Sequence, residues 1–388
     1  METPIYGSVA TGFENVAAAE VRARLGVKCA SNRGNIRFSI DKTRLLEISE
    51  LRTVDNLFGV LYEFAVEGLD TLSNEDALDL IREEVVKVNW ADAVDCWQRA
   101  KDNRSISGGI SKIKTVMKSF VENGTVQPVT ETSPSFRVTC KRGGAKEAHK
   151  FSSMDAARVF GAQLNNIFGW RPDMKNFDME IILNIIKDKM LIMIALNEES
   201  LYKRNVIAFG PTTLRSSICY SMVALASPEP NDKLLDPLCG GGSIPIEGAL
   251  AFPGTHWTGV DNHEKALERC AENYNHNKDN FGLSTIEFVN MDATSLSFAN
   301  DYFNAIVTDM PFGKKIGSIA DNRILYPQFL KEWERVVIPG GKAVILTKDK
   351  RTIENVMKSQ LTAWRMLSST MVNVGGLEVM CAVLLNKK

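Results

Sequence analysis

From residue 232 to the end of the chain, short apolar runs alternate with longer segments whose apolar residues recur every three or four positions. The runs predict strands and the segments predict helices, because side chains alternate faces along a strand and repeat every 3.6 residues along a helix. The predicted strands lie near 233–236, 257–261, 285–289, 303–308, 341–347, 364–371 and 378–385, and the predicted helices near 243–251, 263–276, 324–337 and 351–359. This alternation predicts a doubly wound parallel sheet over residues 232–388, with the last two strands free to form a hairpin.

The first half of the chain has a mixed pattern. Residues 1–90 predict an α+β region, which we class as ferredoxin-like, with strands at 5–9, 36–40 and 57–66 and helices at 14–25 and 78–88. Residues 91–204 predict a second α+β domain with an amphipathic helix at 108–120, a strand from 135, a helix at 152–168 and a strand pair at 179–186 and 190–196. Residues 205–231 form a linker and a leading helix predicted over 212–226.

The composition is that of a globular protein, with 44% hydrophobic and 24% charged residues and a net charge of -1. Any nucleic-acid affinity must therefore come from local basic patches. The seven cysteines are scattered singly and in odd number, which suits a reducing compartment and gives no metal-binding spacing, so no metal site is expected. The start of the chain has no secretory signal pattern, and no apolar run is long enough for a bilayer, so we expect no membrane association and a cytoplasmic or nuclear location.

Three glycines mark a turn between a predicted strand and a predicted helix. The sequence runs Asp236-Pro-Leu-Cys239-Gly240-Gly-Gly242-Ser-Ile-Pro-Ile-Glu247. Glycines let a ligand lie against bare backbone, and the following helix directs free N–H groups toward the same place. Asp261 lies about 20 residues further on, where an acidic residue of a nucleotide-binding unit accepts hydrogen bonds from ribose hydroxyls. A P-loop is excluded because no Gly-Lys-Ser/Thr follows, whereas a dinucleotide dehydrogenase stays open on these residues alone.

A second group of residues decides between these alternatives. The predicted strand 303–308 ends in Asp309-Met310-Pro311-Phe312. A carboxylate and a backbone carbonyl at this position can accept hydrogen bonds from an exocyclic amine, proline fixes the turn, and phenylalanine can stack on a flat base for about 1–3 kcal/mol. Asp292, after another strand, is a candidate acceptor for an adenine amine.

In this order, the glycine turn, Asp261, Asp292 and the Asp309 motif resemble the motifs of class I S-adenosylmethionine-dependent amino-methyltransferases. The cysteine before the glycines, the Ile-Pro-Ile-Glu after them and the later Asp-Met-Pro-Phe-Gly-Lys resemble more narrowly the THUMP-domain tRNA guanine-N2-methyltransferases, in particular the eukaryotic group. The resemblance implies a Rossmann-like methyltransferase domain at 232–388 and a THUMP RNA-binding domain at 91–204.

The resemblance implies roles for individual residues. Asp309, Met310, Pro311 and Phe312 are the expected catalytic residues. The expected contacts to S-adenosyl-L-methionine come from Thr213, Asp236, Cys239, Gly240, Gly242, Asp261, Asp292 and Asp309. For Thr213, helix capping is an equal alternative, and we favour packing of the turn over a nucleophilic role for Cys239. The expected RNA contacts are Lys141, Arg142, Lys146, Lys150 and Lys314, for which plain solvation is the alternative.

The expected reaction is methyl transfer to the exocyclic N2 of a guanosine in tRNA. The resemblance further implies a small zinc-binding methyltransferase-activator subunit as a partner. Two alternatives stay open: methylation of another RNA, small nuclear or ribosomal, and a catalytically silent RNA-binding subunit. Protein glutamine methylation is disfavoured, since its enzymes share Asn-Pro-Pro-Tyr where this chain has Asp-Met-Pro-Phe.

Overall fold

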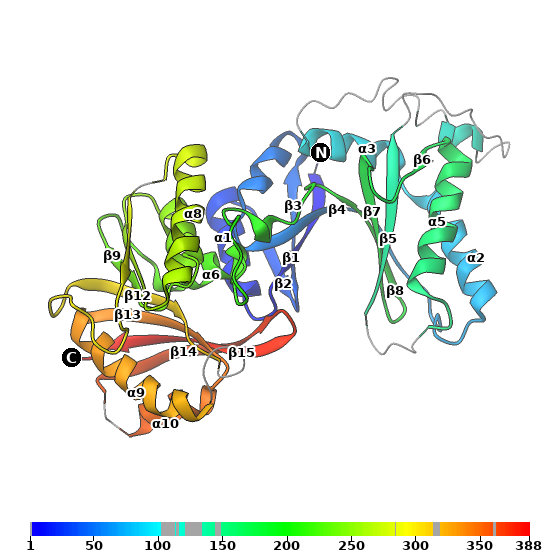
Figure 1. The fold of residues 1–388 in the computed structure, drawn as a ribbon. Helices are drawn as coiled ribbons and strands as arrows, with labels where there is room; N and C mark the ends of the chain where they lie inside the picture. Colours follow the sequence, from blue (N-terminus) through cyan, green and yellow to red (C-terminus); the bar gives the residue numbers. More distant parts are fainter. Residues whose placement is uncertain are drawn as a thin grey trace.

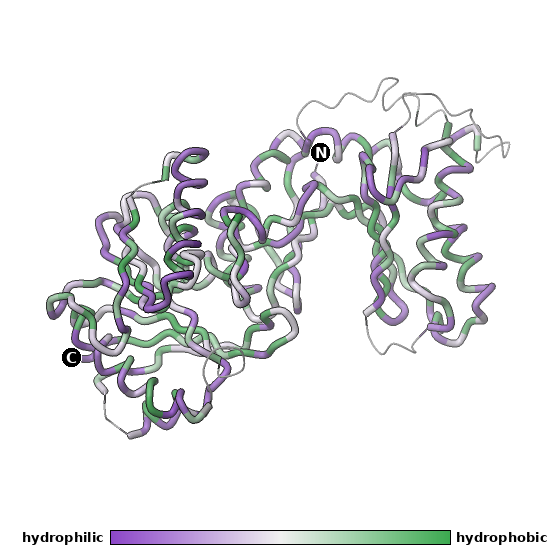
Figure 2. Tube along the Cα trace, viewed as in Figure 1, coloured by the Kyte–Doolittle hydropathy of each residue, from purple (hydrophilic) through white to green (hydrophobic). Residues whose placement is uncertain are grey.

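The computed structural model describes residues 2–101, 113, 116–120, 134–143, 149–283, 285–312, 319–359 and 362–388. Within these residues the strands form two sheets, one of eight strands and one of seven. Figure 1 shows three parts side by side: the C-terminal sheet with its helices, a central part built by β1–β3 and α1, and a third part around β5–β8 and α5. Figure 2 shows apolar segments along the central strands of these parts.

The C-terminal half confirms the predicted alternation of strands and helices. Its strands are β9 (Lys233–Asp236), β10 (His256–Asp261), β11 (Ile286–Asn290), β12 (Phe303–Asp309), β13 (Val337–Thr347), β14 (Trp364–Val374) and β15 (Leu377–Asn386). Its helices are α6 (Ser216–Ala226), α7 (Ser243–Ala251), α8 (Glu264–Phe281), α9 (Ile319–Val336) and α10 (Lys350–Lys358). Helices cover both faces of this sheet (Figure 1).

The sheet has the strand order β11-β10-β9-β12-β13-β15-β14. Its first five strands run parallel, while β15 pairs antiparallel with both β13 and β14. The chain order reverses between β9 and β12, and in such sheets the ligand lies at the carboxyl ends of the strands beside this reversal. The last two strands, β14 and β15, form an antiparallel hairpin. This agrees with the sequence, in which no helix is predicted between them.

The other sheet joins the first two predicted regions. Its strands are β1 (Glu2–Val9), β2 (Cys29–Asn32), β3 (Asn35–Asp41), β4 (Val54–Ala65), β5 (Ser135–Gly143), β6 (Arg171–Pro172), β7 (Met179–Ile186) and β8 (Lys189–Ala195). Its helices are α1 (Glu14–Leu25), α2 (Asn74–Glu84), α3 (Trp90–Ala100) and α5 (Ser153–Phe168), with short 3-10 turns at Lys42–Glu50, Val85–Lys87 and Leu201–Lys203. The long strand β4 pairs with β1 on one side and with β8 on the other, so hydrogen bonds cross residue 90. The division at that residue stays a prediction.

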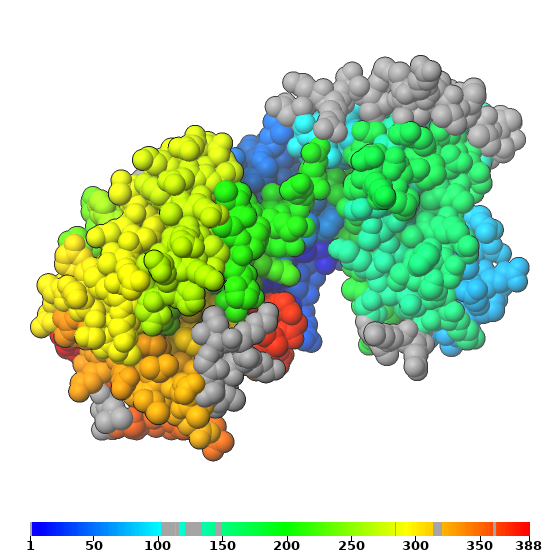
Figure 3. Space-filling model, in the orientation of Figure 1, coloured from blue at the N-terminus to red at the C-terminus, as the bar shows by residue number. Residues whose placement is uncertain are grey.

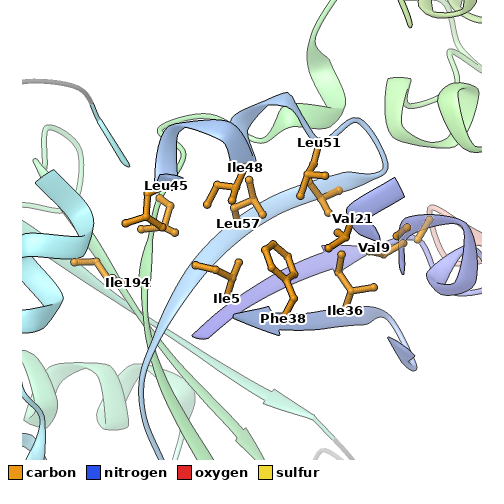
Figure 4. Packing of buried hydrophobic residues seen from close by; sticks show 14 of the residues in the cluster. Ile5, Val9, Val21, Ile36, Phe38, Leu45, Ile48, Leu51, Leu57 and Ile194 are labelled. Carbon is orange, nitrogen blue, oxygen red and sulfur yellow. The ribbon is translucent and has the colours of Figure 1, made fainter. Parts of the chain in front are cut away.

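A buried apolar layer holds the central part together. Figure 4 shows Ile5, Ile36, Phe38 and Leu57 from three strands facing Val21 of α1. All five are at most 5% exposed. Their removal from water stabilises the sheet by roughly 1.5–3 kcal/mol for each side chain that is fully buried.

Most local predictions hold at the level of element type. The hydroxyl of Ser152 accepts a hydrogen bond from the Asp155 N–H and so caps α5, at the start of the helix predicted from residue 152. The helix predicted over 212–226 begins only at Ser216, because residues 210–213 form a turn in which the Thr213 N–H donates to the Gly210 carbonyl. Helix α3 went unpredicted. The amphipathic segment 108–120 lies largely outside the described residues.

Two buried acidic groups join the N-terminal sheet to the C-terminal half. The Glu247 carboxylate in α7 is fully buried and accepts hydrogen bonds from Arg52 at 2.9 Å, Arg204 at 3.2 Å and Asn205 at 2.6 Å. The Asp55 carboxylate in β4 binds the Arg215 guanidinium at 2.8 Å and the Ser217 hydroxyl. Since removing one partner of a buried ion pair is costly, these contacts fix the two halves against each other.

Candidate active site

The parallel strands bring four aspartates to one edge of the C-terminal sheet. Asp236 ends β9, Asp261 ends β10 and Asp309 ends β12, while Asp292 follows β11 by two residues. The order β11-β10-β9-β12 places all four strand ends next to one another. The sheet therefore assembles residues that are up to 73 positions apart in the sequence.

The glycine turn is shaped by its backbone. Gly240 and Gly242 have φ angles of +54° and +80°, a region that residues with a Cβ rarely adopt. The Gly240 N–H donates to the Asp261 Oδ2 at 3.0 Å, which ties the turn to the end of β10. A Cβ added at Gly240 would meet no atom within 4 Å, so open space lies against this residue.

Cys239 lies inside the turn. Its Sγ is 3.8 Å from the Sγ of Cys270, and the Cys270 thiol donates to the Gly240 carbonyl at 3.1 Å. The hydrogen bond with Cys270, together with burial, raises the pKa of the Cys239 thiol well above its usual value. Because a thiolate is the nucleophilic form, this environment supports a packing role.

Asp236 and Asp309 end the two central strands, where Asp236 is buried and Asp309 is half-buried. Asp236 is 1% exposed, and its Oδ1 accepts from the Thr308 hydroxyl at 2.7 Å and from the Leu238 N–H at 3.2 Å. Burial raises the pKa of Asp236 to about 7. Burial, and then the neighbouring Asp236, raise the pKa of Asp309 well above its usual value. The Asp309 Oδ1 is buried and has no hydrogen-bond partner among the described residues.

Asp261 and Asp292 lie closer to solvent. The half-buried Asp261 accepts through Oδ1 from the His263 N–H at 2.9 Å and through Oδ2 from Gly240. The exposed Asp292 accepts through Oδ1 from the N–H and hydroxyl of Thr294. Each carboxylate also has lone pairs left for hydroxyl or amine donors.

The turn after Asp309 is anchored from α9 and β13. The Pro311 carbonyl accepts from the Asn322 amide at 3.1 Å and from the Tyr326 hydroxyl at 2.6 Å. The Tyr326 hydroxyl also pairs with Thr347 at 2.8 Å. The sequence analysis did not identify Asn322, Tyr326 or Thr347 as anchors of this turn. The only hint in the sequence is a tyrosine within the helix predicted at 324–337.

The anchoring changes our expectation for the two carbonyls of the turn. Both lone pairs of the Pro311 carbonyl are engaged, so we expect the carbonyl of Met310 to be the acceptor for an amine. The Met310 side chain is buried and its N–H donates to the Leu346 carbonyl at 2.9 Å. The ring of Phe312 is half-buried at this turn.

Thr213 lies in the turn before α6. Its hydroxyl accepts from the Gly210 N–H at 2.6 Å. The neighbouring Arg215 guanidinium lies 4.6 Å from the ring centre of Tyr202 and pairs with Asp55. These contacts give Thr213 a local structural role next to the junction of the two halves.

Three of the five basic residues predicted to contact RNA, Lys141, Arg142 and Lys150, lie among the described residues. Lys141 is exposed on β5, and the exposed Lys150 donates to the Thr71 carbonyl at 3.1 Å. The Arg142 guanidinium donates to the Ser153 hydroxyl at 3.1 Å and to two backbone carbonyls before α5, so much of its hydrogen-bonding capacity is used inside the domain. Lys146 and Lys314 lie outside the described residues.

Neither a metal site nor a membrane helix is found in the described part of the chain. No three His, Cys, Asp or Glu residues there lie close enough to hold a metal ion. No helix there has the length and apolarity needed to cross a bilayer.

The parallel sheet with its antiparallel final pair, the glycine turn after β9 and the acidic strand ends define a Rossmann-like class I methyltransferase fold. Residues 204–380 match the model of the RMKL-like methyltransferase domain, and residues 111–195 match the model of the THUMP domain. The tRNA (guanine(6)-N(2))-methyltransferase THUMP3 of Bos taurus is 35% identical over 97% of this chain and 87% of its own length. The chain belongs to this family of THUMP-domain tRNA guanine-N2-methyltransferases, which confirms the resemblance noted in the sequence.

Solved structures share the whole fold. TrmN from Thermus thermophilus superposes with a TM-score of 0.75 at 21% identity and covers 99% of both chains. SMU.472, which was solved in complex with SAH, superposes with a TM-score of 0.71 at 16% identity and covers 98% of this chain and 97% of its own. The two sheets therefore recur together in one arrangement.

Proposed function

We propose that this protein transfers a methyl group from S-adenosyl-L-methionine to the exocyclic N2 of a guanosine in tRNA, at position 6 as in its vertebrate relatives. The observation that carries the proposal is the Asp309 Oδ1, a buried acceptor without a partner among the described residues, at the strand end beside the glycine turn. A base amine that reaches this place supplies the missing donor.

The glycine turn and its neighbours fit the cofactor. The open space at Gly240 leaves room for a ligand against the backbone, and Gly242 begins helix α7. We assign Asp261 to the ribose hydroxyls and Asp292 to an adenine amine. When bound, S-adenosyl-L-methionine supplies an electrophilic methyl group, so the protein's main task is to hold the acceptor amine in line with it.

The Asp309 turn acts on the acceptor amine. An aromatic amine is a weak nucleophile because its lone pair is delocalised into the ring. Hydrogen bonds from the amine to the Asp309 carboxylate and the Met310 carbonyl localise that lone pair, and Phe312 stacks on the base. Since hydrogen bonding favours the charged carboxylate, arrival of the amine lowers the raised pKa of Asp309, which can then take up the departing proton directly or through water.

The N-terminal half supplies the grip on RNA. The target guanosine must leave its helix at a cost of a few kcal/mol, which contacts elsewhere on the tRNA offset. We assign contacts to the phosphate backbone of the tRNA to Lys141, Lys146, Lys150 and Lys314. Arg142 contributes less to RNA binding, because its guanidinium is hydrogen-bonded within the domain. A small zinc-binding activator subunit stays a prediction, as do the cytoplasmic or nuclear location and the domain limits 1–90, 91–204, 205–231 and 232–388.

The test is methylation of unmodified tRNA by the purified protein, with and without the activator subunit, followed by nucleoside analysis and mapping of the product. We expect N2-methylguanosine at position 6. The Gly240→Val variant should lose cofactor binding in calorimetry and all transfer, because its side chain fills the open space and opposes the positive φ. Label on adenine N1 or cytosine C5, or on small nuclear or ribosomal RNA in preference to tRNA, would overturn the substrate assignment.

A further inference from the structure

The linker between the two halves carries two large apolar side chains on its surface. Ile207 is 54% exposed and Phe209 is 57% exposed. Figure 1 shows the green segment before α6 running alongside α8, and Figure 3 shows green atoms at the surface of the molecule there. Exposed aromatic residues on a fixed backbone are a common device for binding flat ligands.

The backbone of this linker is held rigidly by one buried side chain. Asn273 of α8 is 0% exposed, and its Oδ1 accepts from the N–H groups of Ile207 at 2.9 Å and Ala208 at 2.8 Å. Its amide group donates to the Ala208 carbonyl at 3.2 Å and to the Gly241 carbonyl at 2.9 Å. The same asparagine therefore fixes the linker to the glycine turn, and a ligand that binds Phe209 need not order this backbone first.

A cation lies beside the same segment. A Cβ built on Gly210 would come within 3.1 Å of the Arg269 Nε, and one built on Gly241 within 3.7 Å of the Arg269 Cβ. The guanidinium thus packs against Gly210, next to the glycine turn. Its Nε is buried and has no hydrogen-bond partner among the described residues.

We propose that Phe209 and Arg269 form a second nucleotide-binding position on this enzyme. A base of the RNA substrate stacks on the Phe209 ring, and the Arg269 guanidinium binds a phosphate of the same strand. The bound nucleotide is not the target guanosine, because the target amine must reach Asp309. The inference rests on the proposed function and adds the linker to the surfaces that hold the RNA near the cofactor.

The chemistry of the pair favours RNA as the occupant. An exposed aromatic ring at Phe209 and a guanidinium packed against the next residue, Gly210, match the alternation of base and phosphate along an exposed strand. Asn273 holds the backbone of Ile207 and Ala208 against the Gly241 carbonyl, and the Arg269 Cβ lies beside Gly241, so the segment before Phe209 and the arginine both adjoin the glycine turn.

Two variants of the full-length protein test the proposal through tRNA affinity. Phe209→Ala should weaken tRNA binding about 5- to 100-fold, the range for loss of one stacked base, and leave its salt dependence unchanged. Arg269→Gln should weaken binding more at low salt and reduce the slope of log affinity against log salt by about one. The matched controls are Phe281→Ala, an aromatic residue that is 60% exposed at the other end of α8, and Arg351→Gln on the exposed face of α10.

Cofactor affinity and thermal stability are measured on every variant. The proposal expects both to match wild type, with single-turnover methyl transfer at saturating tRNA also retained. Wild-type tRNA affinity in both Phe209→Ala and Arg269→Gln would overturn it, as would a loss of cofactor affinity in place of tRNA affinity. Failure of the wild-type protein to methylate tRNA at guanine N2 would instead overturn the proposed function, and the two failures are therefore distinguishable.

Discussion

Four aspartates lie at neighbouring strand ends, yet the inner and outer pairs have different environments. Asp236 and Asp309 end the central strands β9 and β12, and burial raises the pKa of both carboxyls. Asp261 and Asp292 belong to β10 and β11 at the sheet margin, where they are half-buried or exposed and accept backbone hydrogen bonds. The difference teaches that position in the sheet gives one residue type two electrostatic environments. Under the proposed function we assign the acceptor amine to Asp309 and the cofactor to Asp261 and Asp292.

The strongest test of the difference between the inner and outer aspartates is to remove the carboxylate of Asp309. Asp309→Ala should lower single-turnover methyl transfer on the order of 10²–10³-fold, because a preorganised hydrogen-bonding group is lost where charge develops. Cofactor and tRNA affinities should change little, since the amine contact matters more in the transition state than in the ground state. Phe312→Ala should differ by weakening tRNA binding as well. Transfer at the wild-type rate by Asp309→Ala would rule out the mechanism.

The pH dependence of stability tests the buried environment of Asp236. In the unfolded chain an aspartate has a pKa of about 3.9, whereas the folded pKa is about 7. Between these values the folded state holds a proton that the unfolded state has released. The free energy of unfolding of the wild type should therefore fall as pH rises from about 4 to about 7, by on the order of a few kcal/mol.

Asp236→Asn should flatten this profile, because the amide keeps an acceptor for Thr308 and carries no titrating charge. Chemical denaturation of the cofactor-free protein at several pH values between 4 and 8 measures the slope. Asp309 contributes in the same direction, so the variant should retain part of the slope. Equal slopes in wild type and variant would contradict a desolvated Asp236.

The outer pair should show smaller effects, confined to cofactor affinity. Asp261→Ala should weaken S-adenosyl-L-methionine binding about 10- to 100-fold, because it removes a charged acceptor worth about 1.5–3 kcal/mol and also the anchor of Gly240. Asp292→Ala, at an exposed site, should weaken it by less than about 10-fold. Calorimetry gives both affinities, and saturating cofactor should restore transfer. A defect in Asp261→Ala that saturating cofactor cannot restore would place this residue in the chemistry.

The sequence by itself determined the strand and helix alternation of residues 232–388, the glycine turn and the acidic strand ends. These features depend on local physics, since apolar periodicity and the backbone freedom of glycine act within a few residues. The same local rules predicted the helix from residue 152 and left the last two strands free to form the hairpin that the structure has. Helix α3 carries the same kind of local signal, with buried residues at Trp90, Val94 and Trp97 and a cap at Asn89, so its pattern was overlooked.

Tertiary structure alone decided which of these residues are buried and what they contact. The raised pKa values of Asp236 and Asp309 arise from desolvation, which depends on strands and helices that the sequence places far away. Arg142, near the end of β5, is turned inward by carbonyls before α5. Arg52 meets Glu247 across 195 positions, and Asn273 joins the linker to the glycine turn. Such contacts depend on chain folding over long separations, because hydrogen bonds and dielectric environment are properties of packed neighbours and no local pattern encodes them.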